Sequence, residues 1–420
     1  MNLAERDKKV IWHPFTVQKS MASPIPIVSG KGSLLIDEQG NEYIDAISSW
    51  WVNLHGHAHP YIAEKIYRQA LTLEQVIFAG FTHAPAVQLA ERLISILPGN
   101  FSRIFYSDNG STSTEVALKM GIQFWWNKGI PERKKILAFN NSYHGDTFGA
   151  MSVSDRSVFT LAFHDLLFEV IFIDAPTAEN ISEIKSVVEK NGHHIAAFIY
   201  EPLVQGAGGM KMTDPVLLNE LLDTVKQAKI ICIADEVMTG FGRTGVLFAS
   251  NYMHNKPDII CLSKGLTGGT MALGVTACTD AIYQAYLDDD LMKTFFHGHS
   301  FTANPLACTA ALASLDLLEQ PICMQQIAWI SQQNKGFAEK LVGKKGLKNI
   351  RTIGTILAFE IDSGKDEYLN KIGATLTAKS MQNGIYLRPL GNTVYTMPPY
   401  CINNAELCSI YDNIEQLIEF

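Results

Sequence analysis

Six short apolar runs in the middle of this 420-residue chain constrain its fold more than any other feature. The runs are rich in β-branched residues, and they are continuous rather than alternating. Such runs are typical of strands that are buried on both faces of a parallel sheet. The pattern therefore predicts an α/β fold in which helices cover a mostly parallel central sheet. The expected strands are Arg103–Ser107, Lys135–Phe139, Glu169–Ile173, Ile195–Tyr200, Ile230–Ala234 and Asp258–Leu262.

Polar or glycine-rich sequence follows nearly every one of these runs. In an open α/β sheet, ligands bind at the carboxyl ends of the strands. The strand ends of this chain therefore nominate one common site. These ends are Asp108-Asn109-Gly110-Ser111, Asn141-Ser142-Tyr143-His144-Gly145, Glu201-Pro202, Asp235-Glu236 and Ser263-Lys264-Gly265.

The two ends of the chain differ from its middle. Residues 1–50 are rich in turn sequences, and residues 320–420 mix helical sequence with short strands such as Thr355–Ile361. We expect the two ends together to form a small α+β domain. Residues 51–319 are then expected to form a large domain that holds the site.

Charge and composition exclude several classes of protein. The formal net charge is −8, whereas nucleic-acid-binding proteins usually show positive charge, at least in patches. No apolar run is long enough to span a bilayer, and the N-terminus lacks a stretch of the signal-peptide type. The seven cysteines include no C-x-x-C motif and indicate a reducing compartment. We expect a cytoplasmic enzyme that binds neither nucleic acid nor membrane.

Asp235 and Lys264 follow two of the expected strands. Taken alone, the aspartate fits a helix cap or an ion pair, and the lysine fits the surface. Together they match the needs of pyridoxal 5'-phosphate, which requires a lysine for its aldehyde and an acidic residue for its pyridine nitrogen. Desolvation after a buried strand would lower the pKa of the lysine and favour that attachment.

Two further segments fit the same cofactor. Residues 108–115 follow a strand and open a helix, whose N-terminus would bind a phosphate. Within this segment, Thr112 and Glu115 fit a capping box. Tyr143 lies beyond another strand end and would stack on the cofactor ring. An ordinary capped helix and an ordinary loop tyrosine are the plain alternatives.

Two motifs point to other chemistry, and we expect neither to provide it. Gly240–Gly245 matches G-x-G-x-x-G, but a dinucleotide site needs the glycines directly between a strand and a helix. His55, His57 and His59 resemble a metal cluster, but no matching set of cysteines or histidines accompanies them. We expect structural histidines and no metal. A nicotinamide-dependent oxidoreductase and a cofactor-free scaffold remain as alternatives to a pyridoxal-phosphate enzyme.

The whole chain resembles the class III, pyridoxal-phosphate-dependent aminotransferases of fold type I. The class signature is visible in Ala234-Asp-Glu-Val-Met-Thr-Gly-Phe-Gly-Arg-Thr-Gly245 and in Leu262-Ser-Lys-Gly-Leu-Thr-Gly-Gly269. Ser48-Ser-Trp-Trp51 and Tyr143-His-Gly-Asp-Thr147 resemble the members of this class that act in biotin biosynthesis. Those members transfer an amino group to 8-amino-7-oxononanoate.

The resemblance implies a role for each matching residue. Lys264 would bind the cofactor and move the proton, Asp235 would pair with the pyridine nitrogen, and Tyr143 would stack on the ring. Gly110 and Ser111 would hold the phosphate, and Ser300 would reach the phosphate of the partner subunit in a homodimer with shared active sites. The implied substrate-binding residues are Phe15, Trp50, Trp51, Tyr143, Arg243, Lys264, Gly298 and Arg388. In this set, Arg388 would bind the carboxylate of the keto acid and Arg243 would help to select the amino donor.

The amino donor is implied less uniformly. Trp50 and Trp51 resemble the members that use S-adenosylmethionine, whereas His297-Gly-His-Ser300 resembles members that use lysine. Phe15 stands where family members often carry tyrosine, so a hydroxyl near the donor is missing. We expect S-adenosylmethionine as the donor. The alternatives are lysine as the donor of the same reaction, or another class III ω-aminotransferase.

Overall fold

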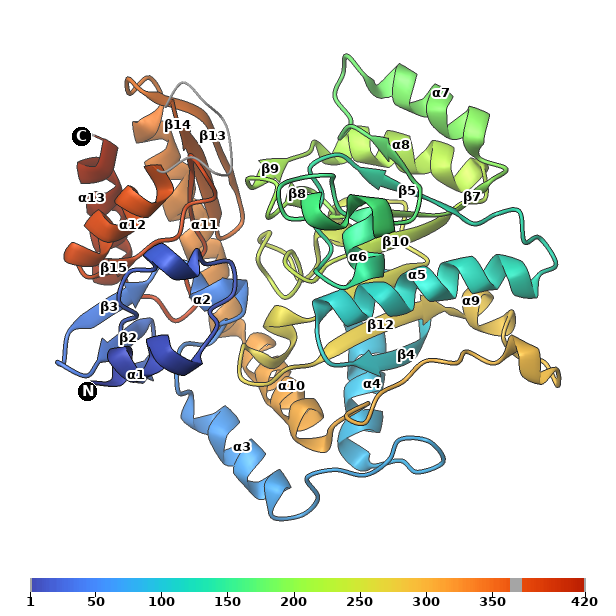
Figure 1. Cartoon of the computed structure of the whole chain (residues 1–420), viewed down its shortest axis with the longest axis horizontal. Helices are drawn as coiled ribbons and strands as arrows, with labels where there is room; N and C mark the ends of the chain where they lie inside the picture. Colours follow the sequence, from blue (N-terminus) through green and yellow to red (C-terminus); the bar gives the residue numbers. More distant parts are fainter. Residues whose placement is uncertain (1, 363–371, 419–420) are drawn as a thin grey trace.

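A seven-stranded sheet forms the centre of the molecule (Figure 1), for which a computed structural model describes residues 2–362 and 372–418. The strand order is β4-β12-β11-β10-β7-β5-β6. Neighbouring strands are parallel except at β12, which is antiparallel to both β11 and β4. The predicted α/β class is therefore confirmed. The strands are β4 (Phe101–Ser107), β5 (Lys135–Phe139), β6 (Val170–Ile173), β7 (Ile195–Tyr200), β10 (Ile231–Asp235), β11 (Ile259–Leu262) and β12 (Gly274–Thr279).

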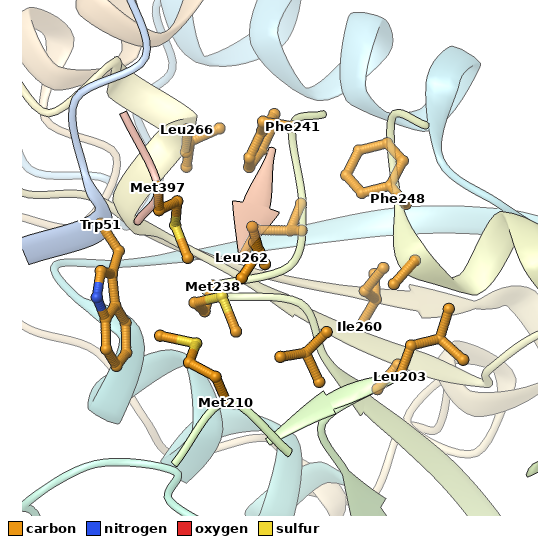
Figure 2. Packing of buried hydrophobic residues seen from close by; sticks show 14 of the residues in the cluster. Trp51, Leu203, Met210, Met238, Phe241, Phe248, Ile260, Leu262, Leu266 and Met397 are labelled. Carbon is orange, nitrogen blue, oxygen red and sulfur yellow. The ribbon is translucent and has the colours of Figure 1, made fainter. Parts of the chain in front are cut away.

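Both faces of this sheet are buried, which explains the continuous apolar runs. In β5, Leu137 and Phe139 join one apolar cluster, while Ile136 and Ala138 join a second one. Helix α5 contributes to the second cluster, and α7 and α8 contribute to the first. Figure 2 shows part of the first cluster, in which Trp51 of the N-terminal segment meets residues of the large sheet.

Strand β12 is the one strand of the large sheet that the sequence pattern did not predict. Its six residues are small or carry hydroxyl groups, so the apolar signal is weak. The hydroxyl of Thr276 is satisfied inside the sheet, because it donates to the carbonyl of Ser113 at 2.8 Å. The predicted strands were otherwise placed to within two residues. Asp235 is the last residue of β10 rather than the residue after it.

The described helices cover the sheets and connect their strands (Figure 1). They are α1 (Leu3–Val10), α2 (Ser48–Trp51), α3 (Pro60–Ala70), α4 (Ala84–Ile96), α5 (Gly110–Asn127), α6 (Phe148–Val153), α7 (Ile181–Asn191), α8 (Pro215–Gln227), α9 (Asp280–Gln284), α10 (Pro305–Leu318), α11 (Pro321–Leu341), α12 (Ile372–Gln382) and α13 (Asn404–Ile418). Within residues 2–362 and 372–418, no single helix is long and apolar enough to cross a membrane. Helices α10 and α11 pass that test only as a pair, and they are bent by 71° at the break between them.

The two ends of the chain meet in a shared sheet. The strand order is β1-β2-β3-β15, and the N-terminal β3 pairs in parallel with the C-terminal β15. A three-stranded sheet, β13-β14-β16, lies beside it (Figure 1). The domain boundaries at residues 50 and 320 stay a prediction. The remaining strands are β1 (Ile27–Lys31), β2 (Leu34–Asp37), β3 (Glu42–Asp45), β8 (Val204–Gln205), β9 (Lys211–Met212), β13 (Leu347–Ile353), β14 (Ile356–Ile361), β15 (Ile385–Tyr386) and β16 (Thr393–Thr396).

Candidate active site

A cavity of about 440 Å³ lies at the carboxyl ends of β4, β5, β10 and β11. Its position is the one that the strand ends predicted. Six of the predicted site residues line it: Trp51, Gly110, Ser111, Tyr143, Asp235 and Lys264.

Lys264 lines this cavity two residues after the end of β11, at the start of the short 3-10 helix η4 (Lys264–Thr267). Its backbone is held in the left-handed region, with φ +40°. The Nζ atom lies 5.1 Å from the centre of the Trp51 ring. Burial lowers the pKa of the Lys264 amine below its usual 10.5, while the carboxylates of Asp235 and Glu201 partly oppose that shift. The Lys264 amine therefore loses its proton more readily than a surface lysine does, which suits a nucleophile.

Asp235 ends the neighbouring strand, and its side chain is almost completely buried. Its Oδ2 accepts a hydrogen bond from His144 Nδ1 at 2.6 Å, and its Oδ1 accepts one from the N–H of Val237 at 3.1 Å. His144 was not assigned a role from the sequence. Its place beside Tyr143 in the Tyr-His-Gly-Asp-Thr run was the available signal.

The N-terminus of α5 also lines the cavity. Asn109 caps this helix, because its side chain accepts from the N–H of Thr112 at 2.9 Å while its own N–H donates to the Thr112 hydroxyl. Gly110 faces Val237 closely: a β-carbon at position 110 would lie 2.8 Å from a Val237 methyl group. The first turn of the helix therefore offers backbone N–H groups and the Ser111 hydroxyl at a point where no larger residue fits at position 110.

The predicted capping box of Thr112 and Glu115 is wrong. Thr112 pairs with Asn109 instead, one turn earlier. Glu115 caps a different helix: its carboxylate accepts from the Thr147 hydroxyl at 2.5 Å and from the N–H of Gly149 at 2.7 Å, at the start of α6. Sequence spacing alone did not distinguish a local cap from one made between two helices.

A buried carboxyl group holds the backbone of Tyr143. Glu201 Oε1 accepts from the N–H of Tyr143 at 3.0 Å, and Oε2 accepts from the N–H of Gly206 at 2.8 Å. Burial raises the pKa of Glu201 to about 7, although His144 and the two N–H donors act in the opposite direction. Glu201 therefore fixes the loop that carries Tyr143.

Phe15, Trp50 and Phe159 form an aromatic wall that ends at Tyr143. Phe15 contacts Trp50 edge-to-face at 5.4 Å and Phe159 at 5.9 Å, and Phe159 contacts Tyr143 at 6.4 Å. The guanidinium of Arg388 lies over the ring of Trp50, 4.2 Å from the ring centre. Tyr143 and Phe159 also line a second cavity of about 560 Å³. The structure thus brings together four predicted substrate residues, Phe15, Trp50, Tyr143 and Arg388, and it adds Phe159, which no sequence pattern indicated.

The comparisons with known proteins agree with this geometry. The family model described as aminotransferase class-III matches residues 16–418. The chain belongs to the class III aminotransferases. It is 48% identical, over 97% of this chain and 98% of the relative, to the adenosylmethionine-8-amino-7-oxononanoate aminotransferase of Synechococcus elongatus. The corresponding enzyme of Geobacter sulfurreducens is 39% identical, over 99% of this chain and 97% of the relative.

Solved structures extend the comparison to three dimensions. The adenosylmethionine-8-amino-7-oxononanoate aminotransferase of Methanocaldococcus jannaschii superposes with a TM-score of 0.95 at 34% identity, covering 99% of this chain and 98% of that one. The omega transaminase of Pseudomonas jessenii, in complex with PMP, superposes with a TM-score of 0.94 at 25% identity, covering 100% and 98%. The predicted family and fold type are therefore confirmed.

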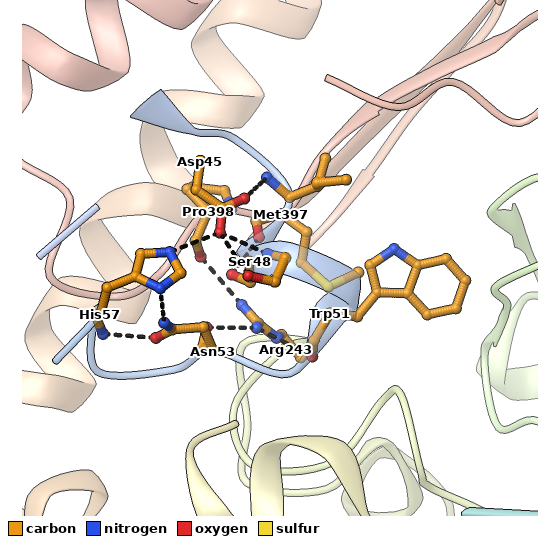
Figure 3. A network of polar contacts seen from close by, with 11 residues as sticks. Asp45, Ser48, Trp51, Asn53, His57, Arg243, Met397 and Pro398 are labelled. Carbon is orange, nitrogen blue, oxygen red and sulfur yellow. Dashed lines mark hydrogen bonds and ion pairs between the residues drawn. The ribbon is translucent and has the colours of Figure 1, made fainter. Parts of the chain in front are cut away.

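In this aminotransferase, Arg243 lies outside both cavities. Its side chain is 1% exposed, and its guanidinium donates to three backbone carbonyls (Figure 3). The acceptors are Asn53 at 3.0 Å, Pro398 at 3.1 Å and Trp51 at 3.3 Å. Arg243 thus ties the segment that carries Trp51 to the C-terminal part of the chain. The predicted role of Arg243 in selecting the amino donor stays a prediction.

Gly298 and Ser300 also lie outside the two cavities, in an exposed segment between η5 (Leu291–Lys293) and α10. The backbone carbonyl of Ser300 accepts a hydrogen bond from Gln75 of the same chain. The predicted contact of Ser300 with a partner subunit stays a prediction.

The two motifs that suggested other chemistry have structural explanations. Gly240–Gly245 forms turns between β10 and η3 (Ala249–Tyr252) and does not open a helix after a strand. His55 and His57 have separate partners, the Ser314 hydroxyl and the Asp45 carboxylate. Burial lowers the pKa of His55 to about 3. Across residues 2–362 and 372–418, no group of three or more His, Cys, Asp or Glu side chains could hold a metal ion.

Proposed function

We propose that this aminotransferase converts 8-amino-7-oxononanoate to 7,8-diaminononanoate in biotin biosynthesis, with S-adenosylmethionine as amino donor and pyridoxal 5'-phosphate as cofactor. The observation that carries the proposal is the meeting of Lys264 and Asp235 at adjacent strand ends in one cavity. The names of the full-length relatives support the substrate and the donor.

The residues of the cavity fit the cofactor in each of its parts. The Lys264 amine matches the aldehyde, and the buried Asp235 carboxylate matches the pyridine nitrogen. The N-terminus of α5 and the Ser111 hydroxyl match the phosphate, and Gly110 leaves the close approach that a side chain would block. The Tyr143 ring would cover one face. When bound, pyridoxal 5'-phosphate supplies an electron sink for the carbon that loses a proton.

The chain's own residues would divide the remaining work. Lys264 Nζ takes the proton from the carbon that carries the donor nitrogen and returns a proton to the acceptor carbon. Burial lowers the pKa of this amine, so its neutral, basic form is easier to reach than that of a surface lysine. Asp235 holds a proton at the pyridine nitrogen, and His144 orients that carboxylate through the 2.6 Å hydrogen bond. Donor and acceptor use the same site in turn, which predicts ping-pong kinetics.

Arg388 and the aromatic wall would select the acceptor. Among the residues that the structure describes, no carboxylate pairs with the Arg388 guanidinium, which instead stacks on Trp50. The guanidinium is therefore available to bind the carboxylate of the keto acid in a bidentate manner. The aliphatic chain of that acid would then lie along Trp50 and Phe15 toward the reacting centre.

Lysine is the alternative donor. The segment His297–Ser300 favours it, and Phe15 lacks the hydroxyl that family members often carry near the donor. Absorption spectra of the purified enzyme with its cofactor distinguish the two. We expect S-adenosylmethionine to remove the visible absorption of the cofactor bound to Lys264. In a separate sample, we expect the free amino acid lysine to leave this absorption unchanged. The opposite result would assign the chain to the lysine-using branch. Borohydride reduction and peptide mapping should label Lys264, and a label on another lysine would contradict the assignment.

We further propose a homodimer with shared sites in the cytoplasm. The exposed segment that carries Ser300 supports the first point, because its side chains do not contribute to the cavity of their own subunit. The free state of all seven cysteines, five of them buried, supports a reducing compartment. Light scattering tests the dimer. A mixed dimer of Lys264→Ala and Ser300→Ala subunits would regain one intact site if the sites are shared.

A further inference from the structure

The turn that carries the two tryptophans is strained. Ser48, Ser49 and Trp51 have φ values of 54°, 59° and 66°, in the left-handed region that non-glycine residues rarely adopt. Each such residue costs roughly 1–3 kcal/mol, and the conformation persists only where the surroundings hold it. The four residues of α2 therefore need contacts with the surrounding structure to keep this conformation.

The strained turn presents its two rings to two different cationic residues. The Trp51 ring faces the Lys264 amine at 5.1 Å, and its indole N–H donates to the Tyr395 hydroxyl at 2.8 Å. The Trp50 ring lies under the Arg388 guanidinium at 4.2 Å. The backbone of the turn thus sets the distance between the reacting end of the site and its carboxylate-binding end.

Asp45, the last residue of β3, supports the start of this turn, while Arg243 holds the Trp51 carbonyl at its end. The side chain of Asp45 is fully buried. Its Oδ2 accepts from the N–H of Ser49 at 2.6 Å and from the Ser49 hydroxyl at 3.2 Å. Its Oδ1 accepts from the N–H of Ile47 at 3.2 Å. His57 Nε2 donates to the same carboxylate at 3.0 Å, and Asn53 holds the other ring nitrogen of His57 (Figure 3).

We propose that Asp45 is a positioning residue of the active site: by holding the strained turn at residues 48–51, it places Trp51 against Lys264 and Trp50 under Arg388. Asp45 touches none of the groups that react. The roles of the two tryptophans rest on the proposed function, but their placement by Asp45 does not.

Asp37 provides a matched control in the same sheet. Its carboxylate is also buried, and it also holds a turn, accepting from the N–H groups of Gln39 and Asn41 at 2.9 and 2.8 Å and from the Tyr43 hydroxyl at 2.9 Å. That turn carries no residue of the site. Asp37→Asn therefore tests the general loss of a buried carboxylate, whereas Asp45→Asn tests the positioning role.

The test uses the full-length holoenzyme with 5-fluorotryptophan in its six tryptophan positions. Trp50→Phe and Trp51→Phe assign the two fluorine resonances. In Asp45→Asn we expect these two resonances to shift or broaden, because the asparagine side chain has only one acceptor oxygen in place of two. In Asp37→Asn we expect no change in either. The kcat/KM of the amino transfer should fall about tenfold or more in Asp45→Asn and less than twofold in the control.

Unchanged Trp50 and Trp51 resonances in folded Asp45→Asn overturn the proposal, as do equal changes in the control. If Asp45→Asn does not fold, Ser49→Ala serves in its place, because it removes one donor to Asp45 and keeps the N–H. Smaller changes at the same two resonances support the proposal, whereas the absence of any change in them overturns it. The fluorine spectra need no substrate, so a failure here is distinct from a failure of the proposed reaction.

Discussion

The cavity at the strand ends and the aromatic wall beside it are built in different ways. Asp235 ends β10, and Lys264 follows the adjacent parallel strand β11. Because Asp235 pairs with Cys261 of β11, sheet hydrogen bonds fix the separation of the two residues. The wall instead joins Phe15, Trp50 and Phe159, with Arg388 above, from four segments that are distant along the chain. Side-chain packing holds these segments together, along with the hydrogen bonds to Asp45 that fix the turn carrying Trp50.

This difference indicates a division of labour. Groups that must be placed accurately for proton transfer lie on rigid elements. Groups that recognise the body of the substrate lie on loops and terminal segments, which tolerate substitution better. Changes in the cavity should therefore abolish the reaction, while changes in the wall should alter the preference for substrates.

The largest effect should come from Lys264→Ala. The variant loses both the cofactor attachment and the base, so we expect kcat to fall by about 10⁴-fold. Steady-state rates and the visible absorption of the bound cofactor measure this. Lys190→Ala, on the exposed side of α7, is the control and should behave like the native enzyme. A Lys264→Ala enzyme that retains a tenth of the rate would remove the distinction between the cavity and the wall.

The two arginines separate recognition from structure. Arg388→Ala should lower kcat/KM for the keto acid by about 2–4 kcal/mol in transition-state terms, with little loss of stability. Arg243→Ala should instead lower the free energy of unfolding, because it leaves three buried carbonyls without their donor. Single-turnover rates of the second half-reaction and urea unfolding measure the two effects. An unchanged second half-reaction in Arg388→Ala would contradict its assigned role.

The same contrast explains what the sequence could predict. A strand end is a local pattern, so Lys264, Asp235, Tyr143 and the N-terminus of α5 were found from their own neighbours in the chain. The contact of Phe159 with Phe15 joins residues 144 positions apart, and no local pattern encodes it. Arg243 shows the converse: its motif identified the family, but burial against carbonyls became visible only in three dimensions.

Glu201→Gln should change how stability depends on pH. The Glu201 carboxyl has a pKa of about 7 in the folded protein against 4.5 as its ordinary value. The folded state therefore holds the proton more tightly, and native stability is lost as pH rises from about 4.5 through about 7. The full loss is about 3 kcal/mol. Glutamine does not titrate. The free energy of unfolding of the variant, relative to that of the native protein, should therefore rise by that amount between about pH 4 and about pH 8.

Urea unfolding across this pH range measures the difference, with Glu189→Gln on the exposed surface of α7 as the control. A pH-independent difference between Glu201→Gln and the native protein would show that the carboxyl titrates normally. The Tyr143 loop would then be held without an energetic cost at neutral pH.

The smallest effect should come from Phe159→Leu, and it tests the wall most directly. Leucine keeps the apolar bulk but loses the edge-to-face contacts with Phe15 and Tyr143, each worth about 0.5–1.5 kcal/mol. Since Lys264 and Asp235 do not depend on these contacts, kcat should stay within about twofold while KM rises about threefold to tenfold. Phe163→Leu is the matched control, because Phe163 has a similar edge-to-face contact, with Phe148 at 5.8 Å, outside both cavities. Equal effects on KM in the two variants, or a loss confined to kcat, would show that the wall and the cavity act as one unit.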